Sequence, residues 1–192
     1  MPSWGRGKYG DSGGRHIARA FDQYAAGAFF KSDPDSARGF EARLNYLLKH
    51  EGGGEAMAAA GLTPKTGQVV DWLTGDVRPN RNTRERVDKA YRSLRGKNIA
   101  RGLKHKLARD GRGTRVSVEP LPPGKVPPEQ RRRQAQFQDR ETTIRPRDWN
   151  RFVDAWADDD DDALDDAWID VAGDLGSPPE AYFEVGHVGF SI

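Results

Sequence analysis

The sequence contains no cysteine, only two methionines among its 192 residues, and no long apolar run. The lack of cysteine excludes disulfides, thiolate zinc sites and cysteine nucleophiles. No stretch approaches the ~20 apolar residues needed to cross a membrane, and the first residues lack the apolar segment of a signal peptide. We therefore expect a soluble, cytoplasmic protein that has no membrane partner.

Large apolar side chains are also scarce, since Ile, Leu, Val and Phe together make up only 35 residues. That share is low for a fully packed chain, although the net charge of +2 argues against wholesale disorder. The composition predicts one or two small cores with flexible segments between and around them. A single large, enzyme-like core is not expected, and we expect neither enzymatic activity nor a cofactor.

The small net charge hides a separation of charge along the chain. Residues 1–110 carry 21 Lys and Arg against 12 Asp and Glu, whereas residues 111–192 carry 10 against 17. Such asymmetry indicates a half that binds a polyanion, joined to an acidic half with another task. Two solvated surfaces that merely differ in charge are the simpler alternative.

Residues 1–36 are expected to form a flexible basic arm followed by a short helix. The first fifteen residues are rich in glycine and contain three basic side chains. Between His16 and Phe30, apolar residues recur at the spacing of a helix. Ser36 then stands where it can cap the next helix.

Residues 37–60 predict two helices joined by glycines. The first, from Ala37 to His50, gathers apolar residues on one face, with basic residues elsewhere: Phe40, Leu44, Leu47 and Leu48 against Arg38, Arg43 and Lys49. Glycines 52–54 end this helix. Glu55 to Ala60 then form a very short, alanine-rich helix that can pack closely.

The next segment completes a helix-turn-helix pattern. Gly61 can adopt the left-handed conformation of a tight turn, and Thr63 and Pro64 suit the cap and first position of a third helix. That helix should run to Thr74, end at Gly75, and bury Val69, Val70 and Leu73, with Trp72 half buried. A short helix, a glycine turn and a capped helix are typical of DNA-binding helix-turn-helix motifs. An ordinary three-helix bundle is the alternative.

Residues 81–112 strengthen the DNA-binding interpretation, because they hold 12 Lys and Arg against three acids. Apolar residues form a stripe along them: Val87, Tyr91, Leu94, Ile99, Leu103 and Leu107. Gly96 and Gly102 are expected to divide the segment into two helices. A basic amphipathic segment directly after a helix-turn-helix is the pattern expected for phosphate contacts.

The residue types also suggest separate roles for the third helix and for the basic helices that follow it. Lys65, Thr66 and Gln68 lie on the exposed side of the third helix, where Gln can pair with adenine and Lys with guanine. The basic helices should dock on phosphates. The predicted DNA-contacting residues are Thr63, Lys65, Thr66, Gln68, Arg78, Arg81, Arg84, Arg92, Arg95, Lys97, Arg101, Lys104 and Lys106.

The remainder of the chain predicts a linker and a second module. Residues 113–135 should comprise a strand with alternating Val116 and Val118, then a proline-rich linker that includes Pro120. Residues 136–192 should form a small acidic α+β module with a strand at 137–144, helices at 148–157 and 163–175, and a final strand at 182–192. This module is expected to contact a replication or regulatory protein, or to self-associate.

No metal or catalytic site is predicted in that module or elsewhere. The run Asp158 to Asp162 lacks the alternating ligands, central glycine and distal Glu of an EF-hand loop. It is more typical of an acidic cap at a helix N-terminus. The four histidines, at positions 16, 50, 105 and 187, are scattered through different expected elements.

The fold class predicted from these observations is mostly α with a small α+β part. A helix-turn-helix DNA-binding domain at 37–112 would be followed by the acidic module. Because helix-turn-helix proteins commonly bind paired half-sites, we expect a homodimer on double-stranded DNA.

The order of these parts also resembles a known family. The residues concerned are Ala42 to Lys49, Gly61 to Thr63, Trp72-Leu73, Arg84 to Arg95, Gly113 to Val116 and Tyr182 to Ile192. The layout is similar to the telomere terminal proteins of linear actinomycete replicons and their helix-turn-helix relatives on mobile elements. The resemblance implies binding to telomeric or plasmid DNA ends and association with replication proteins.

The resemblance further implies that a side-chain hydroxyl primes DNA replication by joining covalently to the first nucleotide. The corresponding stretch, Pro120 to Pro128, contains no Ser, Thr or Tyr. Thr114 and Ser117 are the nearest hydroxyls. The sequence therefore leaves three functions open: a nucleoid-associated transcriptional regulator or replicon factor, a protein primer, and an interaction module that does not bind DNA.

Overall fold

The computed structural model describes residues 9–175 and 182–192. Over these ranges it has eight α-helices, one short 3-10 helix and four strands in an antiparallel sheet. The predicted fold class, mostly α with a small α+β part, is confirmed. The chain divides into two compact units: a helical unit, Ala25–Ile99, and a sheet unit, which comprises the described residues up to Tyr24 together with Ala100–Ile192. The first eight residues of the expected basic arm lie outside the described residues.

The helical unit contains α2 (Ala37–Lys49), α3 (Gly53–Ala59), α4 (Thr66–Thr74) and the first part of α5 (Arg81–Ala108). As predicted, Ser36 caps α2, because its hydroxyl accepts a hydrogen bond of 2.9 Å from the Gly39 amide. Apolar side chains from all four helices and the loop before α4 form the core: Phe40, Leu44, Tyr46, Leu47, Met57, Leu62, Trp72, Val87, Ala90, Tyr91 and Leu94.

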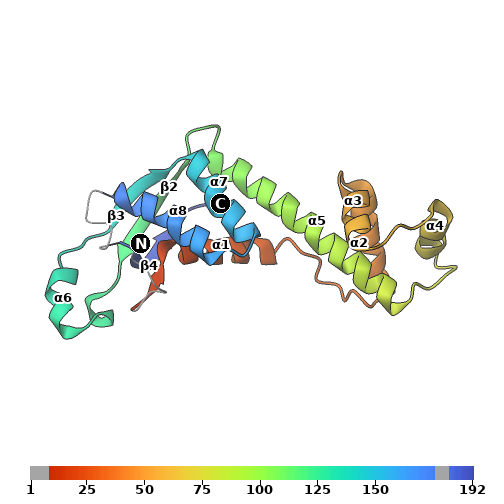
Figure 1. Ribbon diagram of the computed structural model, residues 1–192, viewed down its shortest axis with the longest axis horizontal. Helices are drawn as coiled ribbons and strands as arrows, with labels where there is room; N and C mark the ends of the chain where they lie inside the picture. The colour runs from red at the N-terminus through yellow and green to blue at the C-terminus, as the bar shows by residue number, and fades with distance from the viewer. Residues whose placement is uncertain (1–8, 176–181) are drawn as a thin grey trace. The chain divides into compact units, whose positions relative to one another are not determined.

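Helix α5 is one continuous helix of 28 residues, drawn in green in Figure 1. The prediction of two helices divided at Gly96 and Gly102 was wrong, although all six residues of the predicted apolar stripe are buried. The five-residue step from Leu94 to Ile99 turns an α-helix by about 500°, so the later apolar residues lie on another side of the helix. Val87, Tyr91 and Leu94 are buried in the core of the helical unit and Leu103 and Leu107 in the sheet unit, and this burial offsets the roughly 1 kcal/mol that an interior glycine costs.

The sheet unit is built on β1 (Asp11–Ser12), β2 (Thr114–Pro120), β3 (Arg140–Ile144) and β4 (Glu184–Gly189), in the order β1-β4-β2-β3. Val116 and Val118 are fully buried, Ser117 between them is half-buried, and Arg115 and Glu119 on either side are exposed, which confirms the predicted alternation in this strand. Pro120, expected in the linker, instead pairs with Val185 at an irregularity of the β2–β4 register. Prolines are tolerated at such bulges because they have no amide to donate.

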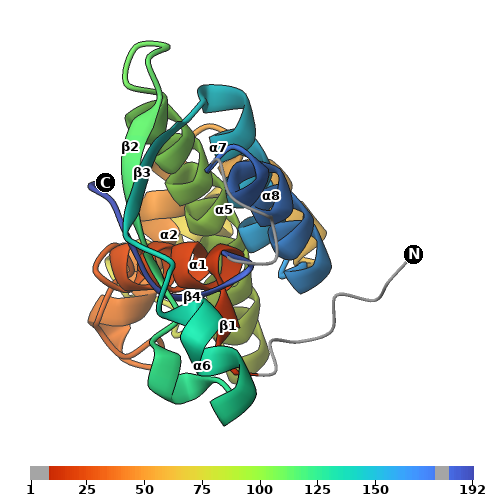
Figure 2. The ribbon, with the colours of Figure 1, turned by 90° about the vertical axis from the view of Figure 1, so that its left-hand side faces the viewer.

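Helices α1 (Gly13–Ala26), α7 (Pro146–Ala157) and α8 (Asp161–Gly173) complete the core of the sheet unit. Figure 2 shows β2 and β3 side by side, with α7 and α8 to one side of them. Trp149, Phe152 and Trp168 are fully buried. Gly13 starts α1 so close to Trp168 that a Cβ there would lie 2.0 Å from the indole Cε2 atom. Only glycine fits this approach.

The predicted domain boundaries, 1–36, 37–112, 113–135 and 136–192, differ from the observed division. β1 pairs with β4, and α1 buries Ile17 and Phe21, so the described part of the expected arm belongs to the sheet unit. β2 is an inner strand of that sheet. The expected linker holds a 3-10 helix, η1 (Pro123–Lys125), and α6 (Pro128–Gln134). No helix within the described ranges is both long and apolar enough to span a membrane.

Candidate nucleic-acid interface

The turn between α3 and α4 has the predicted glycine conformation. Gly61 has φ = 75°, a left-handed value that favours glycine, and its amide donates to Ala58 O over 2.9 Å. The Leu62 amide donates to Met57 O over 2.8 Å, and the Leu62 side chain is buried in the core. Arg86 of α5 donates a hydrogen bond to Gly61 O. The turn is thus held both by its own backbone and by a side chain from α5.

Helix α4 begins two residues later than predicted. Lys65, with extended backbone angles, occupies the N-cap position in place of Thr63, and Pro64 precedes the helix. The Val69 amide donates to Lys65 O over 3.1 Å, which closes the first turn. Lys65 cannot cap with its side chain, because an ammonium group has no acceptor. The first amides of α4 therefore have no side-chain cap.

The buried face of α4 also differs from the prediction. Trp72 is buried, with its ring edge-on to Phe40 at a centroid distance of 6.1 Å, whereas Val70 is 51% exposed. Val69 and Leu73 are only partly buried. Trp72 offers the largest apolar surface on this helix, so the core takes it in. Two helical positions span about 200°, so turning Trp72 inward turns Val70 outward.

The polar residues predicted to read DNA all lie on the surface at the start of α4. Thr63, Lys65, Thr66 and Gln68 are exposed. Arg78, in the loop after α4, is also exposed. These five side chains make no hydrogen bond or ion pair with the residues that the structure describes, so they are available to a ligand.

The predicted phosphate contacts on α5 fall into different environments. Arg81 and Arg92 are exposed but pair with carboxylates of the same helix, Glu85 and Asp88. Lys97 and Arg101 are exposed and have no ion-pair partner within the described ranges. Such exposed pairs are weak, so all four cations can be offered to an anion.

Two further predicted contacts belong to the sheet unit. Lys104 pairs with Asp154 of α7, and Lys106 lies over the Tyr24 ring, 4.8 Å from its centroid. Arg101 is in the same unit. The members of the predicted set are therefore divided between the two units.

Arg84 and Arg95 hold the backbone of the helical unit together. Arg84 is 18% exposed and donates to Asp35 O over 2.8 Å. The Arg95 guanidinium donates twice to Ala28 O, over 2.8 and 3.0 Å, and lies over the Tyr46 ring. Because their donors are engaged by carbonyls distant in sequence, the prediction that these arginines are free to contact DNA is not supported.

Two cations on the exposed side of α5 were not predicted as DNA contacts from the sequence. Arg86 and Lys89 are both exposed. They share a helix face with Lys97, because the three positions lie within about 80° of one another around the helix axis. Val87, Tyr91 and Leu94 were predicted to be buried, so positions on the other side of the helix could have been identified as exposed from the sequence.

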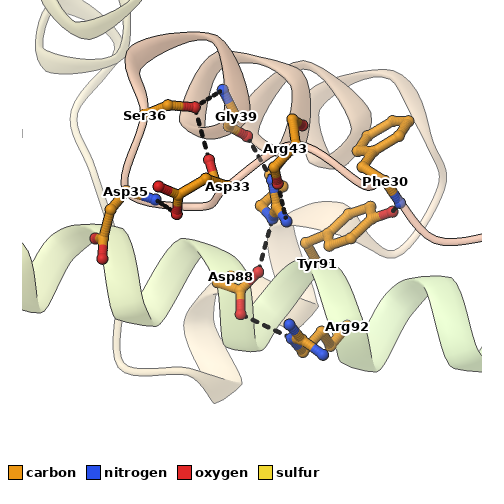
Figure 3. A network of polar contacts seen from close by, with 10 residues as sticks. Phe30, Asp33, Asp35, Ser36, Gly39, Arg43, Asp88, Tyr91 and Arg92 are labelled. Atoms are coloured by element: carbon orange, nitrogen blue, oxygen red, sulfur yellow. Dashed lines mark hydrogen bonds and ion pairs between the residues drawn. The ribbon is translucent and has the colours of Figure 1, made fainter.

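Arg43 occupies the centre of the polar network in Figure 3. The prediction placed it off the apolar face of α2 and Leu48 on it, but Arg43 is 3% exposed and Leu48 is 46% exposed. The Arg43 guanidinium pairs with Asp88 of α5 at 2.6 Å and donates to Gly39 O and Ser32 O at 2.9 and 3.0 Å. These partners compensate the buried positive charge of Arg43. Arg43 can therefore lie on the buried side of α2, whereas Leu48, predicted to lie there, is exposed.

The two hydroxyls considered for priming lie on β2. Thr114 is buried, and its hydroxyl donates to Leu107 O over 2.8 Å. Ser117 is half-buried, and its hydroxyl donates to Gly189 O over 3.3 Å. A nucleotide cannot reach Thr114 without opening the sheet unit, which argues against that candidate.

The acidic run Asp158 to Asp162, which extends into the first turn of α8, serves in part as the predicted helix cap. Asp160 accepts a hydrogen bond of 3.0 Å from the Ala163 amide, and Asp161 pairs with Arg15 at 2.8 Å. Burial raises the pKa of Asp165 above its usual value, although the Ser12 hydroxyl donates to it. Across residues 9–175 and 182–192, no cluster of three or more acidic or histidine side chains could hold a metal ion.

Two of the histidines that the sequence left scattered come together in the sheet unit. The rings of His16 on α1 and His187 on β4 meet edge to face, with centroids 6.2 Å apart. Burial lowers the pKa of His16, and Arg19 lowers it further. The Arg19 guanidinium also donates to Asp11 and lowers the pKa of that carboxyl.

Comparison with protein-family models, with curated proteins and with solved structures finds no match to this chain.

Proposed function

We propose that this chain is a helix-turn-helix DNA-binding protein, acting as a sequence-specific transcriptional regulator or as a DNA-binding factor of a replicon. The observation that carries the proposal is the start of α4, where Lys65, Thr66 and Gln68 are exposed and unpaired among the described residues. They follow a left-handed glycine turn that Arg86 holds. This role implies a cytoplasmic location at the nucleoid.

Base reading is assigned to α4. Gln68 and Lys65 can each make hydrogen bonds to a purine edge in the major groove. Val70, which is 51% exposed, can pack against a thymine methyl group. The first amides of α4, free of a side-chain cap, suit a backbone phosphate at the groove edge.

Phosphate contacts are assigned to exposed cations of the same helical unit. Arg78 lies in the loop after α4, and Lys89 and Lys97 lie on the exposed side of α5. None of them forms an ion pair with a described residue, so binding a phosphate breaks no existing contact. Each such contact releases counterions from DNA, which makes binding salt-dependent.

Two features of the proposal come from the expected class of protein. A homodimer would place two copies of α4 on paired half-sites, and the acidic surface of the sheet unit would contact a replication or regulatory protein. The protein-primer alternative would depend on Ser117, since Thr114 is buried. The interaction-module alternative would use the same cations on an acidic protein.

The test separates base reading from phosphate docking. A preferred duplex is first selected from a random pool with the full chain, and affinities for it and for random duplex are then measured by fluorescence anisotropy. Gln68→Ala should reduce the preference for the selected duplex by about fivefold to 150-fold while random-duplex affinity changes little. Lys97→Ala should weaken binding to both duplexes and lower the salt slope by about one.

Lys125→Ala is the matched control, because Lys125 is exposed but lies in η1 of the sheet unit. It should leave both affinities unchanged. If Gln68→Ala weakened binding to all duplexes equally and Lys97→Ala changed the sequence preference, the assignment of base reading to α4 and of phosphate docking to α5 would be the wrong way round. If the full chain bound no duplex at low salt, the proposal would be wrong.

A further inference from the structure

Phe30 exposes an aromatic ring at the surface of the helical unit. The residue lies in the segment before α2 and is 40% exposed. One face of its ring stacks on Tyr91 of α5, with centroids 5.1 Å apart and planes 6° from parallel. The Phe30 amide donates to the Tyr91 hydroxyl over 3.0 Å, as Figure 3 shows. The ring is thus fixed in orientation while much of it remains in contact with solvent.

A second exposed ring belongs to the same aromatic cluster. His50, at the end of α2, stacks on Tyr46 with centroids 4.0 Å apart and planes 20° from parallel. Tyr46 is buried, whereas His50 is exposed. The ring centroids of Tyr46 and Phe30 are 6.2 Å apart, so both exposed rings rest on one buried support.

Cations accompany both rings. Lys31 follows Phe30 and Lys49 precedes His50, and both lysines are exposed without an ion pair among the described residues. Arg95 lies over Tyr46, 5.3 Å from the ring centroid. Three cations, Lys31, Lys49 and Arg95, thus accompany the rings, against two carboxylates nearby in sequence, Asp33 and Glu51.

Fixed, half-exposed rings flanked by lysines match the chemistry of an unpaired nucleic-acid strand. Bases stack on aromatic side chains whatever their sequence, and flanking cations follow the backbone phosphates. A duplex offers no free base faces along its length. The ligand that fits both the rings and the charge is therefore single-stranded.

We propose that Phe30 and His50, with Lys31 and Lys49, form a stacking platform that binds single-stranded DNA. The choice of DNA over RNA rests on the proposed function, whereas the stacking argument does not. The platform uses none of the residues assigned to duplex reading at α4. Single-strand and duplex binding should therefore be lost through different substitutions.

The experiment measures binding of the full chain to a fluorescent twelve-nucleotide oligo(dT), to a twelve-base-pair duplex, and to oligo(U) of the same length. Phe30→Leu keeps an apolar contact on Tyr91 but removes the ring, and His50→Gln removes the second ring at an exposed position. Each should weaken oligo(dT) binding by about fivefold to 150-fold, the range for losing one stacked base. Duplex binding should change less than about twofold.

Val77→Ala is the matched control, because Val77 is a 48% exposed apolar residue of the same unit and lies outside the aromatic cluster. It should bind oligo(dT) like the unaltered chain. A 2-aminopurine base placed in the oligonucleotide gives a second readout, since stacking should quench its fluorescence with the unaltered chain and less with Phe30→Leu. This readout reports ring contact even if a variant loses some stability.

Three results would overturn the platform. They are the absence of oligo(dT) binding by the unaltered chain, unchanged binding by both ring variants, and tighter binding to oligo(U) than to oligo(dT). Failure of the proposed function would look different, because the unaltered chain would then bind no duplex and Gln68→Ala would have no preference to change.

Discussion

Replacing Arg43 with methionine should strongly destabilise the helical unit. The substitution keeps most of the side-chain volume but removes a charge that is 3% exposed and pairs with Asp88 at 2.6 Å. Removing one partner of a buried pair costs about 3–5 kcal/mol, because the other charge is left unpaired. Asp88 is itself 18% exposed and keeps Arg92 as a partner, so we expect the lower end, about 3 kcal/mol.

The measurement is urea unfolding of the full chain, followed by far-ultraviolet circular dichroism. With a slope of about 1.5 kcal/mol per molar urea for a unit of this size, a loss of 3 kcal/mol lowers its midpoint by about 2 M. Arg92→Met is the matched control. The Arg92 side chain pairs with the same carboxylate but is 64% exposed, so its replacement should lower the free energy of unfolding by no more than about 1 kcal/mol. Equal costs for the two variants would refute the argument that burial makes Arg43 important.

Further substitutions test the helices and the sheet unit. Gly96→Ala and Gly102→Ala should each stabilise α5 by up to about 1 kcal/mol, since no heavy atom lies within 4 Å of the added Cβ; lower thermal midpoints would mean that the helix is not continuous there. Ser36→Ala should cost about 1 kcal/mol through loss of the α2 cap, and an unchanged urea midpoint would contradict this. Burial raises the pKa of Asp165 in the folded chain. The raised pKa stabilises the fold at pH values below the usual pKa of the carboxyl, and this stabilisation is lost as the pH rises through the raised pKa. Asp165→Asn should therefore be more stable than the unaltered chain at about pH 7 but not at about pH 3, and a gain of equal size at both pH values would contradict the sign.

Features governed by neighbouring residues could be predicted from the sequence. Ser36 caps α2, Gly61 and Gly75 take left-handed conformations, and the α5 stripe is buried, because each depends on spacing within one or two turns. The continuity of α5 could not be predicted. Intrinsic propensity favours a break at Gly96, and it took packing in two separate units to override it.

Which segments of the chain belong to each unit depends on pairing between residues that are distant in sequence. The two-residue strand β1 has no periodicity to detect, and only its register with Val185 and Glu184 reveals it. The same limit applies to the interface. Lys97 and Arg95 look alike in sequence, yet Arg95 is engaged by Ala28 O while Lys97 has no partner among the described residues. Which cations are free depends on contacts that no local pattern contains.

The most direct test of DNA binding is a titration of the full chain against random duplex DNA at about 50 and 200 mM salt. Three phosphate contacts, by Arg78, Lys89 and Lys97, predict that affinity falls about 40-fold between these concentrations. Binding that weakens in this way would support phosphate docking by the helical unit. Affinity that does not change with salt, or no binding at the lower salt concentration, would contradict the account.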